Sequence, residues 1–118
     1  MKVRQCLLLV VTVFISGFMV QAQQSAKVTP AGTGYLEYLP PGYNSGSDRY
    51  PVVISLHGVK EKGTSSKDAK AVLRDLPRVA NVGLPKYVKQ GKKYPFILIS
   101  PQLKSQYGLW PGSVVIEV

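Results

Sequence analysis

The chain has 118 residues, a formal net charge of +9, one cysteine and one histidine. This length suffices for one small domain but not for two. The lysines are scattered instead of following one helix face with interleaved aromatic residues, which argues against a nucleic-acid partner. Solubility and a loose attraction to an anionic envelope or an acidic polysaccharide explain the positive charge better.

Residues 1–22 have the layout of a secretory signal peptide. Lys2 and Arg4 give a positive start, an apolar run covers residues 6–20, and Ala22 supplies the small residue after which cleavage is expected. A retained membrane anchor is the alternative, but the apolar run is shorter than the roughly 20 residues that a spanning helix needs. We expect a secreted or periplasmic protein with no stable membrane insertion after cleavage. The only cysteine leaves with the signal peptide, so the mature chain can form no disulfide.

The first part of the mature chain predicts a leader, two strands and a loop. Residues 23–34 are polar and contain Gly and Pro, which indicates a flexible leader. "YLEYL" at 35–39 carries a charge on one face and predicts a strand near a sheet edge. Residues 40–49 are rich in turn formers. "PVVISL" at 51–56 lacks polar alternation and predicts a strand buried on both faces, in the middle of a parallel sheet.

The hydrophobic period changes to that of a helix after Asp68. Apolar residues recur at helical spacing as far as Ala80, and Pro77 should end or kink this helix. A second, short helix is expected over residues 84–91, with Pro85 in its first turn and a closing glycine at its end.

Residues 94–100, "YPFILIS", repeat the design of the earlier apolar strand. Two such strands joined by helices form a βαβ unit, whose crossover is almost always right-handed. "SVVIEV" at 113–118 fits either a strand or a helix by propensity. The expected architecture is an α/β layer fold with a mostly parallel sheet and crossover helices.

Ligands of open α/β sheets gather beyond the carboxyl ends of the strands. His57 lies there, directly after the first apolar strand. A zinc site is a poor interpretation, because the mature chain has no cysteine and no second histidine. A local catalytic triad is equally poor, because no Gly-x-Ser-x-Gly turn occurs in the chain. We therefore expect no metal and no cofactor.

A third role for His57 is to support an oxyanion loop. Gly58 could adopt backbone angles closed to other residues and turn the chain sharply. The amide of Val59 would then point into the cleft, where one such donor contributes roughly 3 kcal/mol of transition-state stabilisation. The alternative is a histidine that ends a strand, has its hydrogen bonds satisfied and takes no part in catalysis. Spacing alone does not separate these two interpretations.

Several segments, taken in order, resemble a known family. They are "YLEYLPPGYN", "YPVVISLHG", "LPKYVKQGKKYPFILISPQ" and the following tryptophan, which together cover about residues 35–111. This pattern is similar to the N-terminal part of secreted α/β-hydrolase esterases. Its nearest counterparts are phospholipase/carboxylesterase-like and predicted-peptidase proteins, akin to polyhydroxybutyrate depolymerase and feruloyl esterases. The resemblance implies a partial, incomplete α/β-hydrolase domain over residues 35–118.

The resemblance also implies roles for individual residues. His57, Gly58 and Val59 match the oxyanion loop, with the Val59 backbone N–H as donor. Gln102 and Trp110 match a loop that borders the substrate cleft, although packing under that loop is the more ordinary role of a tryptophan. Residues 113–118 match the start of a helix. The substrate implied for the complete enzyme is a small ester or an acylated carbohydrate.

The departure from the family pattern concerns the catalytic residues. In the family the serine nucleophile, the acid and the catalytic histidine all follow this part of the chain, and none of them is present here. We expect the leading portion of a carboxylic-ester hydrolase, or possible peptidase, that is inactive alone. The alternative is a small secreted module that binds envelope or polysaccharide without catalysis.

Overall fold

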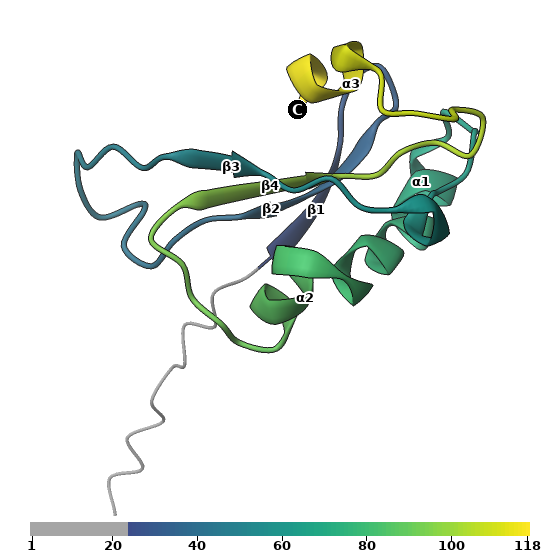
Figure 1. The fold of residues 1–118 in the computed structure, drawn as a ribbon. Coiled ribbons are helices and arrows are strands. Elements are labelled where there is room, and N and C mark those ends of the chain that lie inside the picture. The colour runs from purple at the N-terminus through teal and green to yellow at the C-terminus, as the bar shows by residue number, and fades with distance from the viewer. Residues whose placement is uncertain (1–23) are drawn as a thin grey trace, which may run out of the picture.

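The structure, a computed structural model, describes residues 24–118 (Figure 1). The elements in chain order are β1 (Gln24–Val28), β2 (Gly34–Tyr38), β3 (Val52–Ile54), the 3-10 helix η1 (Val59–Glu61), α1 (Ala69–Asp75), the 3-10 helix η2 (Leu76–Asn81), α2 (Gly83–Lys89), β4 (Ile97–Pro101) and α3 (Gly112–Glu117). The signal peptide predicted for residues 1–22 lies outside the described residues. Over the described range, no helix combines the length and the apolar character that crossing a membrane requires.

The four strands form one mixed sheet in the order β1-β2-β4-β3. β2 runs antiparallel to both β1 and β4, and only β3 and β4 are parallel. The molecule is therefore a small α/β domain, but the mostly parallel sheet predicted from the sequence is wrong. The predicted βαβ unit is present, because α1, η2 and α2 connect β3 to its parallel neighbour β4.

The antiparallel half of the sheet comes from a segment predicted to be a flexible leader. Residues 24–28 pair with β2 along their whole length, from Gln24 opposite Tyr38 to Val28 opposite Gly34. The leader predicted for 23–34 is therefore wrong for its described part, which forms β1 and a tight turn. β2 then lies between two strands and not near an edge. Its charged residue, Glu37, is tolerated there because it pairs with a lysine of β1.

One face of the sheet carries α1, η2 and α2 (Figure 1). Leu36 of β2 packs with the apolar residues of η2, and Tyr38 packs with Leu98 of β4 and Val88 of α2. The α-helix ends at Asp75, one residue before the η2 segment that contains Pro77, as the proline predicted. The second helix and the C-terminal helix α3 also form as expected. In Figure 1, α3 lies on the other side of the sheet from α1 and α2.

β3 is the end strand of the sheet in the described residues, and its outer face is open. Val52 is 58% exposed and Ile54 39% exposed, whereas Val53 points toward the helix-covered core. The prediction that 51–56 is buried on both faces is therefore wrong. A run without polar residues indicates a strand, but burial on both faces also requires elements that pack over both faces. In the described residues the face that carries Val52 and Ile54 is left exposed.

Candidate functional site

The loops that follow the parallel strands β3 and β4 are bound to each other through His57. The side chain of His57 turns inward and is buried. Its Nε2 accepts a hydrogen bond of 2.9 Å from the backbone N–H of Leu103, in the loop after β4. Its Nδ1 lies 2.6 Å from the carbonyl oxygen of Gly58, in its own loop. The imidazole thus holds the main chain of two loops, the one after β3 and the one after β4.

These contacts define the protonation state of His57. A ring nitrogen that accepts an N–H carries no proton, so the proton is on Nδ1 and is donated to the Gly58 carbonyl. Burial lowers the pKa of His57 because it disfavours the imidazolium, while the Gly58 carbonyl and the Glu61 carboxylate, 4.0 Å from Nδ1, oppose this in part. The ring is neutral, and both of its nitrogens are already occupied by main chain. No ring nitrogen is left to move a proton to or from a ligand.

Trp110 holds the same loop through its indole. Its Nε1–H donates to the carbonyl oxygen of His57 at 3.1 Å, and its ring meets the imidazole edge-on with 4.9 Å between ring centroids. The tryptophan is half-buried. It therefore packs on the histidine and restrains the main chain of the loop.

Gly58 does not use a conformation reserved for glycine. Its φ of −85° and ψ of −165° are extended angles that other residues adopt, and the positive-φ glycines lie elsewhere in the chain. The expected sharp glycine-only turn is therefore wrong. A β-carbon at this position would lie 3.4 Å from a carboxylate oxygen of Glu61, so the local space is limited but not closed.

Val59 is the first residue of η1, and its side chain is 74% exposed. The first N–H groups of a helix have no acceptor within the helix. No hydrogen bond from the Val59 amide to another residue in the described part of the chain is found. The donor predicted for an oxyanion is therefore uncommitted and lies directly after the segment that His57 and Trp110 hold.

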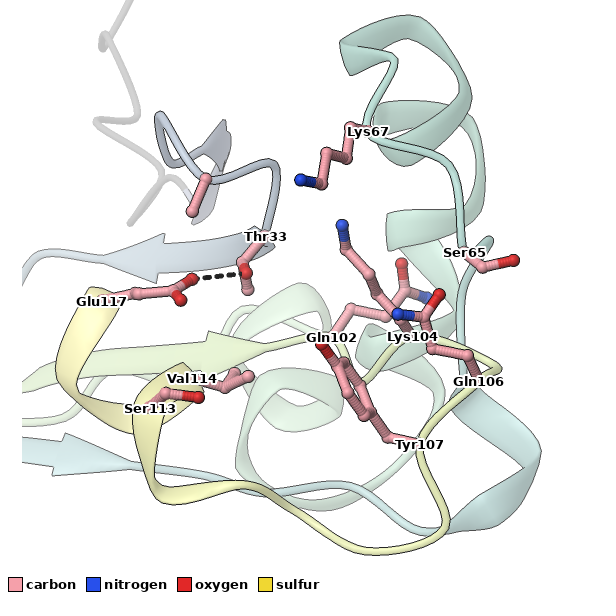
Figure 2. Close-up of a pocket in the computed structure, with 11 residues that line it drawn as sticks. Thr33, Ser65, Lys67, Gln102, Lys104, Gln106, Tyr107, Ser113, Val114 and Glu117 are labelled. Carbon is pink, nitrogen blue, oxygen red and sulfur yellow. Dashed lines mark hydrogen bonds between the residues drawn. The ribbon is translucent and has the colours of Figure 1, made fainter.

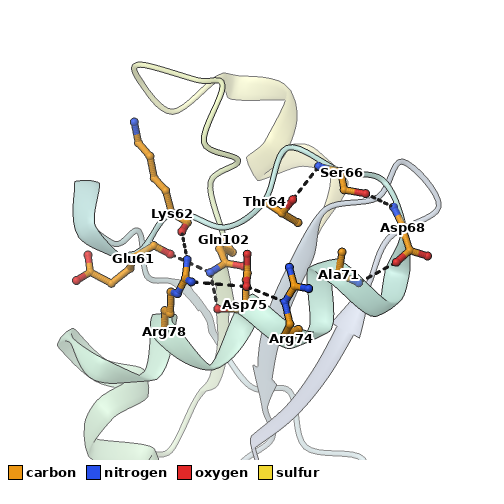
Figure 3. A network of polar contacts seen from close by, with 10 residues as sticks. All are labelled: Glu61, Lys62, Thr64, Ser66, Asp68, Ala71, Arg74, Asp75, Arg78 and Gln102. Carbon is orange, nitrogen blue, oxygen red and sulfur yellow. Dashed lines mark hydrogen bonds and ion pairs between the residues drawn. The ribbon is translucent and has the colours of Figure 1, made fainter.

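Gln102 is buried, and it lines one wall of a cavity that the loop before α1, the loop after β4 and α3 also border. Its side-chain amide donates to the carbonyl oxygens of Glu61 and Asp75, both at 2.9 Å (Figure 3). A β-carbon on Gly63 would come 2.3 Å from the Gln102 side-chain oxygen, so the glycine is what allows this close approach. Gln102 therefore braces the loop of η1 against α1.

Sequence reasoning missed the ionic group around Asp75. Its carboxylate lies 3.4 Å from the Arg74 guanidinium and 3.7 Å from that of Arg78, and Arg78 also donates to the carbonyl oxygen of Lys62 (Figure 3). The only sequence signal was the i, i+3 spacing of Asp75 and Arg78, which is common on solvated helix faces. The group ties α1 and η2 to the loop that follows η1.

His57, Gly58 and Val59 do not line the cavities of about 310 Å³ and about 300 Å³ that lie elsewhere in the described residues. Residues 24–118 contain no cluster of three or more His, Cys, Asp or Glu side chains that could hold a metal ion. The chemistry that the candidate site can offer is thus hydrogen-bond donation from a fixed main-chain amide.

Comparisons of the chain with protein-family models, curated proteins and solved structures give no significant match.

Proposed function

We propose that this chain is the N-terminal part of an exported serine hydrolase that acts on carboxylic esters through an acyl-enzyme. The observation that carries the proposal is the uncommitted N–H of Val59, which follows a loop held by His57 at the carboxyl edge of the parallel pair β3–β4. Negative charge develops on the carbonyl oxygen when an ester is attacked, and a fixed N–H donor stabilises that charge.

His57 contributes to this reaction by positioning. Because its two ring nitrogens bond to the Leu103 amide and the Gly58 carbonyl, the loop is ordered before a substrate arrives. A donor that is already in place costs no reorganisation when the oxyanion forms. The nucleophile and the base belong to residues that are not among these 118, since no Gly-x-Ser-x-Gly turn is present.

The open side of the sheet supports the proposal that the domain is incomplete. Val52 and Ile54 leave apolar surface exposed beside a strand edge that has no partner in the described residues. Exposed aliphatic surface at an unpaired edge favours the addition of further strands and helices. An α/β-hydrolase domain that continues beyond this segment would cover it.

Residues 1–22 would direct export to the periplasm or the exterior. A small ester or an acylated carbohydrate is the proposed substrate, and no nucleic acid, metal or cofactor is needed for the chemistry. Trp110 fits a place beside the reacting group because it packs directly on the loop that ends at Val59.

The first test is the gene itself. A reading frame that continues past the Val118 codon, in phase or after a frameshift, should encode a Gly-x-Ser-x-Gly turn within a few tens of residues. A stop codon followed by unrelated sequence would contradict the proposal.

The second test uses the complete enzyme found in this way. Val59→Pro removes the N–H, yet proline suits the first position of a helix and the extended Gly58 suits the residue before proline. We expect kcat for a nitrophenyl ester to fall by about 10²–10³-fold. Val59→Ala, the matched control, keeps the amide and should keep kcat. Equal losses in both variants would show that the side chain and not the N–H matters.

A further inference from the structure

A second candidate site lies beside the loop that follows β4, and His57 does not line it. A cavity of about 310 Å³ opens between the β1–β2 turn, the loop before α1, the loop after β4 and helix α3. We call it the Lys67–Lys104 cavity, after the two cations that line it. Gln106, Tyr107 and Glu117 also contribute to its walls (Figure 2).

The two lysines line the same part of the cavity, next to the β1–β2 turn. Figure 2 shows both side chains ending near the β1–β2 turn, with Lys67 coming from the loop before α1 and Lys104 from the loop after β4. Gly32 in this turn lies close to both residues, because a β-carbon there would lie 3.3 Å from the Lys67 β-carbon and 3.4 Å from the Lys104 Nζ. Lys104 is half-buried, so its charge is partly removed from water.

Neither ammonium is neutralised by the described part of the protein. The ion pairs of residues 24–118 involve other cations. The one carboxylate in the cavity wall, that of Glu117, accepts a hydrogen bond of 2.7 Å from the Thr33 hydroxyl instead. Two positive charges that line one cavity without a paired carboxylate favour the binding of an anion there.

We propose that the Lys67–Lys104 cavity binds a small oxyanion, either free or as the acidic group of a sugar. Two ammonium groups supply up to six N–H donors, and an oxyanion supplies the several acceptor oxygens that match them. The cavity volume leaves room for a ring attached to the acidic group, with Tyr107 and Gln106 beside it. Of the residues described for the candidate esterase site, Gln102 alone lines this cavity. The inference does not rest on Gln102, so each proposal can fail without the other.

The test is a set of NMR titrations of the ¹⁵N-labelled chain at constant ionic strength. Sulfate, glucuronate and glucose are the three probes, and the backbone amides of Gly32 and Lys67 report binding. Saturable shifts of similar affinity for sulfate and glucuronate support a free oxyanion. Tighter binding of glucuronate supports an acidic sugar. Shifts that never saturate, or glucose binding as tightly as glucuronate, would overturn the proposal.

Variants test which charges are responsible. Lys104→Met should weaken binding by about tenfold or more, the change expected for one lost charge-assisted hydrogen bond. Lys93→Met is the matched control, because Lys93 is exposed, does not line the cavity and carries the same charge. Glu117→Gln removes the nearby negative charge and should tighten binding. Equal weakening by Lys104→Met and Lys93→Met would contradict the site and indicate a response to net charge alone.

Discussion

β3 and β4 come from almost the same kind of sequence, "PVVISL" and "PFILIS", yet they have opposite environments. β4 lies between two strands, and its Leu98 and Ser100 are fully buried. β3 has one neighbour and leaves Val52 and Ile54 exposed. An aliphatic run therefore predicts that a strand forms, whereas the elements packed around the strand determine how far it is buried.

The loops that follow the two strands show the reverse pattern. The polar side chains of His57 and Gln102 are buried. Each forms a hydrogen bond with the main chain of the other loop: His57 with the Leu103 N–H, and Gln102 with the Glu61 carbonyl oxygen. Apolar residues of β3 thus face outward while polar residues just beyond the strands face inward. These inward polar groups join the loops after β3 and β4 into one braced unit.

The largest expected difference between the two strands is their response to truncation. Leu98→Ala should lower the free energy of unfolding by about 2–5 kcal/mol, because it opens a cavity in a fully buried position. Ile54→Ala, in the exposed face of β3, should cost about 1 kcal/mol or less. Urea unfolding measures both, and equal losses would contradict the assignment of β3 to an open face.

Removing the brace between the two loops should have the next largest effect. Gln102→Leu keeps the approximate volume but leaves the carbonyls of Glu61 and Asp75 without their donor. We expect a loss of about 1–3 kcal/mol in the free energy of unfolding. Gln106→Leu is the matched control, since Gln106 is exposed, and it should change stability by less than about 0.5 kcal/mol. A neutral Gln102→Leu would contradict the bracing role.

The segment that enters β4 depends on one tyrosine hydroxyl. Tyr38 donates to the Tyr94 carbonyl at 3.1 Å and accepts from the Tyr94 N–H at 2.8 Å. Tyr38→Phe should therefore cost about 1–2 kcal/mol of unfolding free energy. Tyr87→Phe, at a residue that is 47% exposed, provides the control and should be near neutral. Similar values for the two variants would show that the hydroxyl of Tyr38 is not needed there.

The smallest expected effect is a pH dependence from His57. Its folded-state pKa lies below the ordinary value of 6.5, so the unfolded chain binds the proton more readily. Stability is then full above pH 6.5 and decreases as the pH falls through 6.5 toward the folded-state pKa. Unfolding measured at about pH 7.5 and about pH 5.5 covers this range while most carboxylates stay ionised.

His57→Gln is the control for the pH dependence. The glutamine side-chain oxygen can still accept the Leu103 N–H, but the side chain does not titrate. The decrease in stability between the two pH values should vanish in this variant. Since the chain has a single histidine, an unchanged decrease would assign the effect to other groups.

The sequence predicted the parts of the fold that depend on local pattern. The end of α1 before Pro77 and the parallel crossover from β3 to β4 follow from proline chemistry and from a change of hydrophobic period. β1 could not be predicted, because "QSAKV" has no strand pattern and gains its hydrogen bonds only from β2.

For the candidate site, the sequence indicated His57 and the amide of Val59, since both follow a strand at the ligand-binding edge. It could not indicate that Gly58 is extended, nor that Gln102 turns inward. The sequence could not predict that Lys67 and Lys104 line one cavity, because the tertiary packing of separate loops forms that cavity.

The central claim is that His57 is a neutral residue that holds the loop before Val59, and long-range ¹H–¹⁵N NMR of the imidazole tests it most directly. The account predicts a protonated Nδ1, an unprotonated Nε2 and a pKa below 6.5. A protonated Nε2 at neutral pH, or a pKa above 6.5, would contradict it, because the Leu103 N–H would then have no acceptor on the ring.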